Sequence, residues 1–488
     1  MANLKNLAKE TAIYGLSSII GRFLNYLLVP LYTAKLAAEG GGYGIITNIY
    51  AYVALLLILL TYGMETTFFR FINKEEHNAD KVYSTTLGCI TLTSSLFVML
   101  VFIFINPLSD LLGYASHPSY IWVMAITVAL DAIQGIPFAY LRHKKKAIKF
   151  ASLKLLFIVM NIGLNLFFFL ILPHFTGKAA DVGYAFYINL ACTSVITLFF
   201  WNDFPKSLSI DGALLRQMLR YAWPILILGI AGILNQTADK ILFPYIYKGD
   251  NAHAQLGIYG AASKIAMIMA MIMQAFRYAY EPFVFSKAKD KDSRDTYAQA
   301  MKYFIIFTLL AFLAVMAYMD VLKHIIAPDY WSGLRVVPIV MAAEIMMGIY
   351  FNLSFWYKLT DKTIWGALFS GIGCAVLIGV NVIFVPQYGY MACAWAGVAG
   401  YGTAMILSYV IGQKKFPIKY PIADIATYMA TAAVLTAVIY IADNHLQWGF
   451  WTRMALNTAC VCAFAAMIIK RDMPLSALPV IGKYFRKR

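Results

Sequence analysis

About fourteen apolar stretches of roughly 20 residues follow one another along this chain, and they constrain its fold more than any other feature. A helix of this length crosses the hydrocarbon core of a bilayer, and the runs are too long and continuous to be strands of a closed barrel. Because 61% of the residues are hydrophobic and only 13% are charged, too few polar side chains remain to cover a water-soluble surface. The sequence therefore predicts an all-α polytopic membrane protein.

The predicted spans are joined by short connections. They lie near 12–34, 43–64, 82–106, 119–141, 150–173, 180–201, 221–246, 256–281, 298–320, 334–357, 363–385, 390–412, 422–442 and 450–469. The longest polar connection, 202–220, divides the chain into two six-span lobes, which a final pair of helices follows. We predict an N-terminal lobe at 1–205, a C-terminal lobe at 206–415, and two extra transmembrane helices with a basic cytoplasmic tail at 416–488.

A short repeat relates the two predicted lobes. The sequence LVPLY at 28–32 closes the first span, and LFPY at 242–245 closes the seventh. A Gly/Tyr start to the next span follows each of them, GYG at 42–44 and GIY at 257–259. Two lobes related by a repeat, with the substrate site between them, are the architecture of many secondary transporters.

The basic residues indicate the orientation of the chain in the membrane. They gather in loops on one side, at 142–146, 287–302 and 414–419, and in the tail that ends at Arg488. Cytoplasmic loops carry this excess of Lys and Arg, so both termini are expected in the cytoplasm. The net charge of +16 therefore indicates the lipid bilayer, and not nucleic acid, as a partner.

The sequence carries no motif for bound cofactors or nucleotides. The six cysteines lie in apolar stretches without the spacing of zinc or disulfide sites, so no metal site is predicted. Phosphate-binding and dinucleotide-binding glycine motifs are absent as well. Energy for transport must then come from an H⁺ or Na⁺ gradient, or from the gradient of the substrate itself.

Arg22 lies near the middle of the first span, and no acidic residue in that span neutralises it. Burying an arginine at this depth costs about 2.5–3.5 kcal/mol, so its side chain should face a polar interior. Asn25 lies three residues later, on the same helix face. We interpret both as lining a pathway for an anionic substrate; the alternative is a structural ion pair between Arg22 and Asp131 of the fourth span.

Further charged residues lie inside later spans. Asp239 and Lys240 are adjacent in span seven, where neighbours point about 100° apart, so we expect them to face different ways and Asp239 to pair with Lys264. Arg277 in span eight either receives the substrate or pairs with Glu281, four residues on. The candidate cavity residues are Arg22, Asn25, Lys240, Lys264 and Arg277; the candidates for ion coupling or structural pairing are Asp131, Asp239 and Glu344.

Four stretches resemble the Wzx-like oligosaccharide flippases, which are polysaccharide biosynthesis proteins of bacteria. They are GRFLNYLLVPLYT at 21–33, NQTADK at 235–240, PDYWSGL at 328–334 and YFNLSFWYKLTDK at 350–362. The resemblance implies a member of the multidrug/oligosaccharidyl-lipid/polysaccharide exporter superfamily. It implies two six-helix lobes in a V, a cationic cavity between them and alternating access.

The resemblance also implies a substrate and a location. The expected cargo is an undecaprenyl-pyrophosphate-linked oligosaccharide, moved to the outer leaflet of the bacterial inner membrane for O-antigen, capsule or exopolysaccharide synthesis. Polysaccharide polymerase and assembly proteins are its implied partners. A lipid II flippase and a drug/cation antiporter remain alternatives, although the antiporter is expected to carry acids in its first lobe and few buried cations. A membrane glycosyltransferase or polymerase is less favoured, because the outer loops are too short to hold a catalytic site, and so we expect no enzymatic activity.

Overall fold

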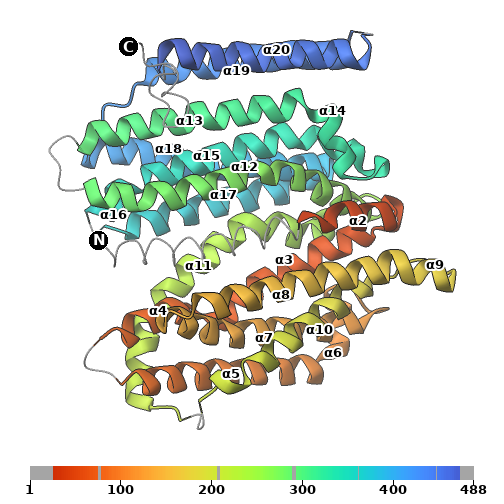
Figure 1. The fold of residues 1–488 in the computed structure, drawn as a ribbon, viewed down its shortest axis with the longest axis vertical. Coiled ribbons are helices and arrows are strands. Elements are labelled where there is room, and N and C mark those ends of the chain that lie inside the picture. The colour runs from red at the N-terminus through yellow and green to blue at the C-terminus, as the bar shows by residue number, and fades with distance from the viewer. Residues whose placement is uncertain are drawn as a thin grey trace. The chain divides into compact units, whose positions relative to one another are not determined.

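The structure is a computed structural model that describes residues 26–74, 78–205, 209–287, 293–360, 362–446 and 448–472, with the backbone alone at 278–279, 281–287 and 293. These residues form helices and connecting turns without a β-strand, which confirms the all-α prediction (Figure 1). Twelve helices in the described ranges are long and apolar enough to cross a membrane. Gly183–Phe199, at the sixth predicted span, is a shorter apolar helix, and the first predicted span lies mostly outside the described residues. The protein is therefore a multi-pass membrane protein.

Packing divides the chain into two compact units. Unit 1 comprises Met1–Ala261 and Asn381–Tyr390, and unit 2 comprises Ala262–Val380 and Met391–Arg488. The division follows contacts between helices and cuts through two of them, α12 (Ala252–Lys287) and α17 (Ile364–Tyr388). The predicted lobe boundaries near 205 and 415 follow the sequence repeat instead, and they stay predictions.

Unit 1 contains the helices of the first half of the chain. They are α2 Leu28–Lys35, η1 Ala38–Gly40, α3 Gly42–Thr61, α4 Met64–Ile72, α5 Ala79–Ile103, α6 Ile105–Leu111, α7 Pro118–His143, α8 Ala147–Leu166, η2 Phe167–Ile171, α9 Leu172–Thr176, α10 Gly183–Phe199, η3 Trp201–Asp203 and α11 Gly212–Ile246. Helix α7 packs against α5, α10 and α3, and it is the most enclosed of the unit 1 spans. Most of its side chains are apolar, which suits this enclosed position.

Local sequence explains how several of these helices begin and bend. Asp211 caps α11, because its carboxylate accepts hydrogen bonds from the backbone N–H groups of Ala213 and Leu214. Gly63, at φ 73°, separates α3 from α4 in the left-handed region that glycine adopts without strain. Helix α8 widens into a π turn, η2, just before Pro173, whose ring cannot fit beside a regular helical carbonyl four residues earlier.

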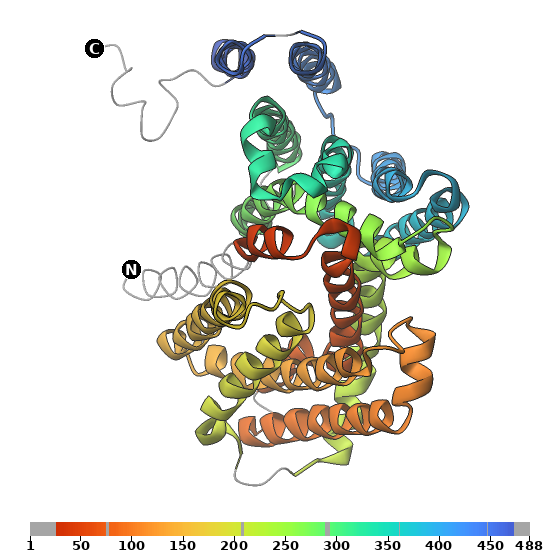
Figure 2. The ribbon, with the colours of Figure 1, turned by 90° about the vertical axis from the view of Figure 1, so that its right-hand side faces the viewer.

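Unit 2 contains most of the remaining helices. They are most of α12 and α17, together with α13 Ser293–Ala317, α14 Met319–Leu322, η4 Lys323–Ile325, η5 Pro328–Val336, α15 Val337–Leu353, α16 Phe355–Leu359, α18 Tyr390–Lys415, α19 Ile422–Asn444 and α20 Phe450–Arg471. The final helix pair, α19 and α20, packs on α13, and Figure 2 shows the pair nearly end-on. Tyr428, Phe464 and Leu313 are fully buried in the core of these three helices.

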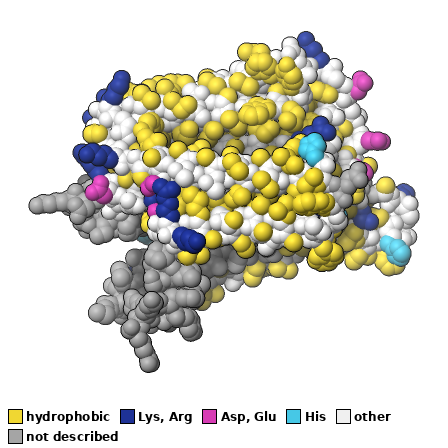
Figure 3. All heavy atoms as spheres, turned by 90° about the horizontal axis from the view of Figure 1, so that it is seen from above, with side chains coloured by type: hydrophobic (Ala, Val, Ile, Leu, Met, Phe, Trp, Pro, Cys, Tyr) yellow, Lys and Arg dark blue, Asp and Glu magenta, His cyan; other side chains and the backbone are white. Residues whose placement is uncertain are grey.

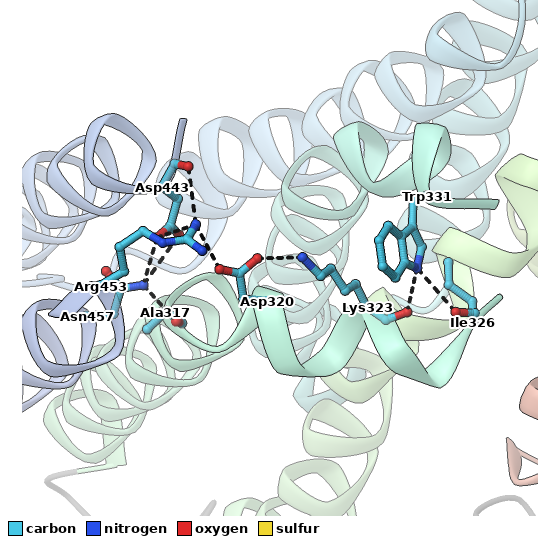
Figure 4. Close-up of polar contacts among 8 residues, drawn as sticks. All are labelled: Ala317, Asp320, Lys323, Ile326, Trp331, Asp443, Arg453 and Asn457. Carbon is cyan, nitrogen blue, oxygen red and sulfur yellow. Dashed lines mark hydrogen bonds and ion pairs between the residues drawn. The ribbon is translucent and has the colours of Figure 1, made fainter. Parts of the chain in front are cut away.

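Ion pairs join the final helix pair to α13 at both ends. At one end, Asp320 forms an ion pair with Arg453 at 2.9 Å and accepts a hydrogen bond from Lys323 at 2.8 Å (Figure 4). At the other end, the Lys302 ammonium contacts the carboxylates of Asp424 and Asp472. Apolar packing between helices gains little inside a bilayer, because lipid tails are equally apolar, so these polar contacts fix where the pair docks.

The surface matches a bilayer environment. Large apolar side chains such as Leu92, Ile103 and Val159 are more than half exposed, which would be unfavourable over so wide an area in water. Figure 3 shows the apolar side chains covering the middle of one face, with charged side chains gathered toward its ends. This distribution places the charged helix ends at the two membrane interfaces and the apolar middle in the hydrocarbon.

Candidate functional site

A group of polar side chains lies among the helices of unit 1, around Asp131 on α7. The Thr193 hydroxyl on α10 donates to the Asp131 carboxylate at 3.3 Å. Lys154 on α8 interacts electrostatically with Asp131, while its ammonium lies 4.0 Å from the centre of the Phe138 ring. The Gln134 amide donates to the backbone carbonyl of Thr193 at 2.8 Å. Three helices therefore contribute to one polar centre inside an apolar bundle.

Asn48 on α3 is the centre of a second polar group, which surrounds α11. Its amide donates to the Lys240 carbonyl at 2.7 Å and accepts from the Tyr114 hydroxyl at 2.8 Å. Asp239, with 7% of its surface exposed, accepts from the Tyr259 hydroxyl at 2.6 Å. These hydrogen bonds tie α3, α11, the loop before α7 and the start of α12 together within unit 1.

The expectation that Asp239 and Lys240 face different ways is wrong. The Lys240 ammonium lies 3.0 Å from one Asp239 oxygen and 3.1 Å from the other. The reason is that the flexible lysine chain folds back along the helix, which also brings the ammonium within 2.9 Å of the Gln236 carbonyl. The predicted pairing of Asp239 with Lys264 would join the two units, and it stays a prediction.

Two cations from different elements of unit 2 lie over the same aromatic ring. The Arg277 guanidinium on α12 and the Lys358 ammonium on α16 each lie 4.5 Å from the centre of the Phe351 ring on α15. Arg277 is exposed and Lys358 is half-buried. Arginine and lysine are the side chains that bind phosphate oxygens most often, so two of them on one aromatic ring place positive charge where an anion can bind.

The remaining predicted site residues are Arg22, Asn25, Lys264 and Glu344. Arg22 and Asn25 lie outside the described residues, as does the side chain of Glu281. Lys264 on α12 and Glu344 on α15 are half-buried within unit 2. Within the described part of the chain, no cluster of His, Cys, Asp and Glu side chains could hold a metal ion.

Comparison with known proteins identifies the family of this chain. Residues 7–287, more than half of the sequence, match the family model described as "Polysaccharide biosynthesis protein". The chain belongs to this polysaccharide biosynthesis protein family. The comparison with curated protein sequences gives no match.

Solved structures share the fold of this polysaccharide biosynthesis protein. A "Lipid II flippase MurJ, inward closed conformation" aligns with a TM-score of 0.72 at 14% identity, covering 94% of this chain and 98% of the other. An inward-facing "multidrug resistance MATE family transporter of the MOP superfamily" aligns with a TM-score of 0.64 at 15% identity, covering 83% and 97%. A further structure, of the "MATE multidrug transporter DinF-BH", aligns with a TM-score of 0.58 at 18% identity, covering 83% and 95%.

Sequence reasoning assigned no role to two cations of this family member. Lys154 lies within the fifth predicted span, where the cost of burial that singled out Arg22 applies to it as well. Lys358 follows Phe351 by seven residues and Phe355 by three, a helical spacing that places cation and rings on one face. The sequence therefore contains both the lysine within a span and the spacing of Lys358 from the rings. Assigning a role to either lysine requires knowing which helix lies opposite it.

Proposed function

We propose that this protein is a flippase that moves an undecaprenyl-pyrophosphate-linked oligosaccharide across the bacterial inner membrane during synthesis of a cell-surface polysaccharide. The observation that carries the proposal is the family match over 7–287, since lipid-linked sugars must change leaflet before they are polymerised outside the cell. The lipid II flippase fold agrees with a lipid-linked cargo. Both termini are expected in the cytoplasm, with polymerase and assembly proteins as partners on the outer face.

The cations of the chain suit the charge of this cargo. A pyrophosphate carries at least two negative charges, which cost too much to move through hydrocarbon without positive partners. Arg277 and Lys358 each lie 4.5 Å from the centre of the Phe351 ring, so two positive charges are placed around one side chain. In the proposed mechanism they bind the pyrophosphate, Arg22 receives it farther along the pathway, and the polyprenyl tail stays in the bilayer.

A lipid II flippase is the second candidate, supported by the TM-score of 0.72 to the MurJ structure. Its cargo carries the same polyprenyl pyrophosphate and differs in the sugar and peptide that follow. The charge chemistry of the site therefore serves either cargo. Competition between the two lipid-linked headgroups for one flippase separates the candidates.

Leaflet exchange in proteoliposomes tests the proposal. A polyprenyl-pyrophosphate oligosaccharide with a fluorescent sugar is placed in the vesicles, and a membrane-impermeant reagent quenches the headgroups in the outer leaflet. The wild type should exchange the headgroup between leaflets, and Arg22→Ala, Arg277→Ala and Lys358→Ala should each slow exchange at least about tenfold, the factor that corresponds to about 1.4 kcal/mol. Lys248→Ala removes an exposed cation and should keep the wild-type rate. Equal rates in the wild type and in protein-free vesicles would refute the proposal.

A further inference from the structure

Asp131 is held in an unusual way for a charged group in a membrane protein. Its carboxylate accepts one side-chain hydrogen bond, from Thr193 at 3.3 Å, among the residues that the structure describes. Lys154 is the nearby cation, yet its ammonium rests on the Phe138 ring rather than in contact with the carboxylate. On α7, the adjacent Ala132 and Val128, one turn earlier, are fully buried and apolar, whereas Gln134, one turn later, is polar and bonded to Thr193.

The charged and titratable groups around Asp131 come from three helices. They are Lys154 on α8, Tyr50 on α3 and Cys192 on α10, and Glu65 and Arg142 act on Lys154 from the next layer. Only Lys154 among the three is a cation that can pair with the Asp131 carboxylate. An ionised carboxylate with one hydrogen bond in this setting is costly, and either a proton or a direct contact with Lys154 removes much of the cost.

A proton suits this site better than a metal cation does. Binding of H⁺ and binding of Na⁺ change the charge beside Lys154 by the same amount, so the number of oxygen ligands decides between them. Hard cations need several oxygen ligands, whereas among the described side chains the Thr193 hydroxyl is the one that hydrogen-bonds the Asp131 carboxylate. A proton adds no separate ion and needs one carboxylate oxygen.

A row of polar side chains leads from Asp131 toward the other end of the bundle. The Tyr32 hydroxyl donates to the Asn165 side chain at 2.7 Å, and Asn165 donates to the Asn161 carbonyl at 2.8 Å. The Asn161 side chain lies close to the Cys192 thiol, and Cys192 is the neighbour of Thr193 in α10. The row runs along one face of α8 among apolar side chains, and its successive polar groups can guide water or a proton.

We propose that Asp131 is a proton-binding site, loaded through the row from Tyr32 to Cys192, and that Lys154 is its alternating partner. When the Asp131 carboxyl holds the proton, Lys154 rests on Phe138. When the proton leaves, the carboxylate attracts the Lys154 ammonium and draws α8 toward α7. The use of this proton to drive transport rests on the proposed function, whereas proton binding itself does not.

Infrared difference spectroscopy on the purified full-length protein in lipid vesicles tests the site without any substrate. Titration with pH should show a protonated-carboxyl C=O band that titrates apart from the bands of the exposed acids, and Asp131→Asn should remove that separate band. Asp203→Asn is the matched control, because Asp203 is a largely buried acid already paired with Lys149, and it should leave the band in place. A band that survives in Asp131→Asn would overturn the proposal.

Two further variants test the partner and the route. Lys154→Met removes the positive charge and should move the midpoint of the Asp131 titration to higher pH, because the charged carboxylate loses its stabilising neighbour. Asn161→Leu should slow proton exchange at Asp131 while leaving the midpoint in place. An unchanged midpoint in Lys154→Met would refute the partnership. Thermal unfolding of each variant establishes that the protein is folded.

Coupling is then measured with the leaflet-exchange assay. A pH gradient across the vesicles should drive the wild-type headgroup into one leaflet, and an equal Na⁺ gradient should not. Asp131→Asn should still exchange headgroups downhill but should ignore the pH gradient. Wild-type exchange that does not respond to the pH gradient would overturn the coupling and leave the flippase proposal intact. If the wild type exchanges no headgroups at all, the flippase proposal is overturned, and the infrared band still tests the proton site.

Discussion

The Arg453 guanidinium on α20 forms an ion pair with the Asp320 carboxylate, beyond the end of α13, at 2.9 Å. Asp320→Asn leaves Arg453 with a weaker partner, so the free energy of unfolding should fall by about 1–3 kcal/mol. The double variant Asp320→Asn/Arg453→Met should lose less than the sum of the single variants, because the two side chains share one interaction. Chemical unfolding in detergent measures all three. Asp110→Asn removes an exposed carboxylate and is the control. A loss in the double variant equal to the sum of the losses in the two single variants would contradict the pairing of Asp320 with Arg453.

Asp472 should make the docking of the final helices sensitive to acid. Burial favours its neutral form, but hydrogen bonds from Lys302 and Tyr428 outweigh that effect and lower the pKa of Asp472. A lowered pKa in the folded state contributes stability above the ordinary carboxyl pKa of about 3.9, and that stability is lost as the pH falls through the lowered value. Unfolding temperatures across acidic pH should fall less steeply for Asp472→Asn than for the wild type. Parallel curves would contradict this assignment.

Gly44 and Gly257 should not accept a larger side chain, because α3 and α12 meet there within unit 1. A Cβ on Gly44 would lie 1.8 Å from the His253 carbonyl oxygen and 2.9 Å from the Gly257 nitrogen. Gly44→Ala should therefore lower the free energy of unfolding by about 1–3 kcal/mol or more. Gly163→Ala is the control, because a Cβ there meets no atom within 4 Å, and alanine should stabilise α8 by up to about 1 kcal/mol. Similar losses in both variants would show that helix contact is not the cause.

Lys240 should matter for stability chiefly through Asp239. Lys240→Met removes the described cation beside the buried Asp239 carboxylate and leaves it the Tyr259 hydroxyl and the backbone N–H of residue 240, so unfolding should become easier by about 1–3 kcal/mol. Adding Asp239→Asn to Lys240→Met should recover part of the loss, because the uncompensated charge disappears. Thermal unfolding in detergent compares the single and double variants. A further loss in the double variant would show that Asp239 has a second charged partner, as the predicted pairing with Lys264 requires.

The helices could be predicted from the sequence, since long apolar runs leave a membrane helix as the one solution for their backbone polar groups. The contacts between helices could not be predicted from the sequence. Lys302 and Asp320 lie near the ends of one predicted span, and nothing in the sequence indicates that α19 and α20 pack beside them. The contact between Lys240 and Asp239 was missed for another reason, because helix geometry fixes where a Cβ points but not where a long, flexible side chain ends.

The candidate site was predicted in part for the same reason. The cost of burying charge singled out Arg277 and Asp131, and the structure adds Lys358 and Lys154 beside them. Which cation faces which acid depends on the rotation of each helix about its axis. A single sequence shows which residues lie on the same face of a helix. It does not show which neighbouring helix that face contacts.

The central claim is that the protein moves an anionic lipid-linked sugar rather than a soluble cation. The most direct test measures both activities in one preparation of proteoliposomes: leaflet exchange of a fluorescent polyprenyl-pyrophosphate oligosaccharide, and uptake of a fluorescent organic cation against a proton gradient. We predict headgroup exchange that Arg22→Ala abolishes and Arg22→Lys partly restores, without cation uptake above protein-free vesicles. Cation uptake by the wild type, with headgroups that stay in their leaflet, would contradict the account.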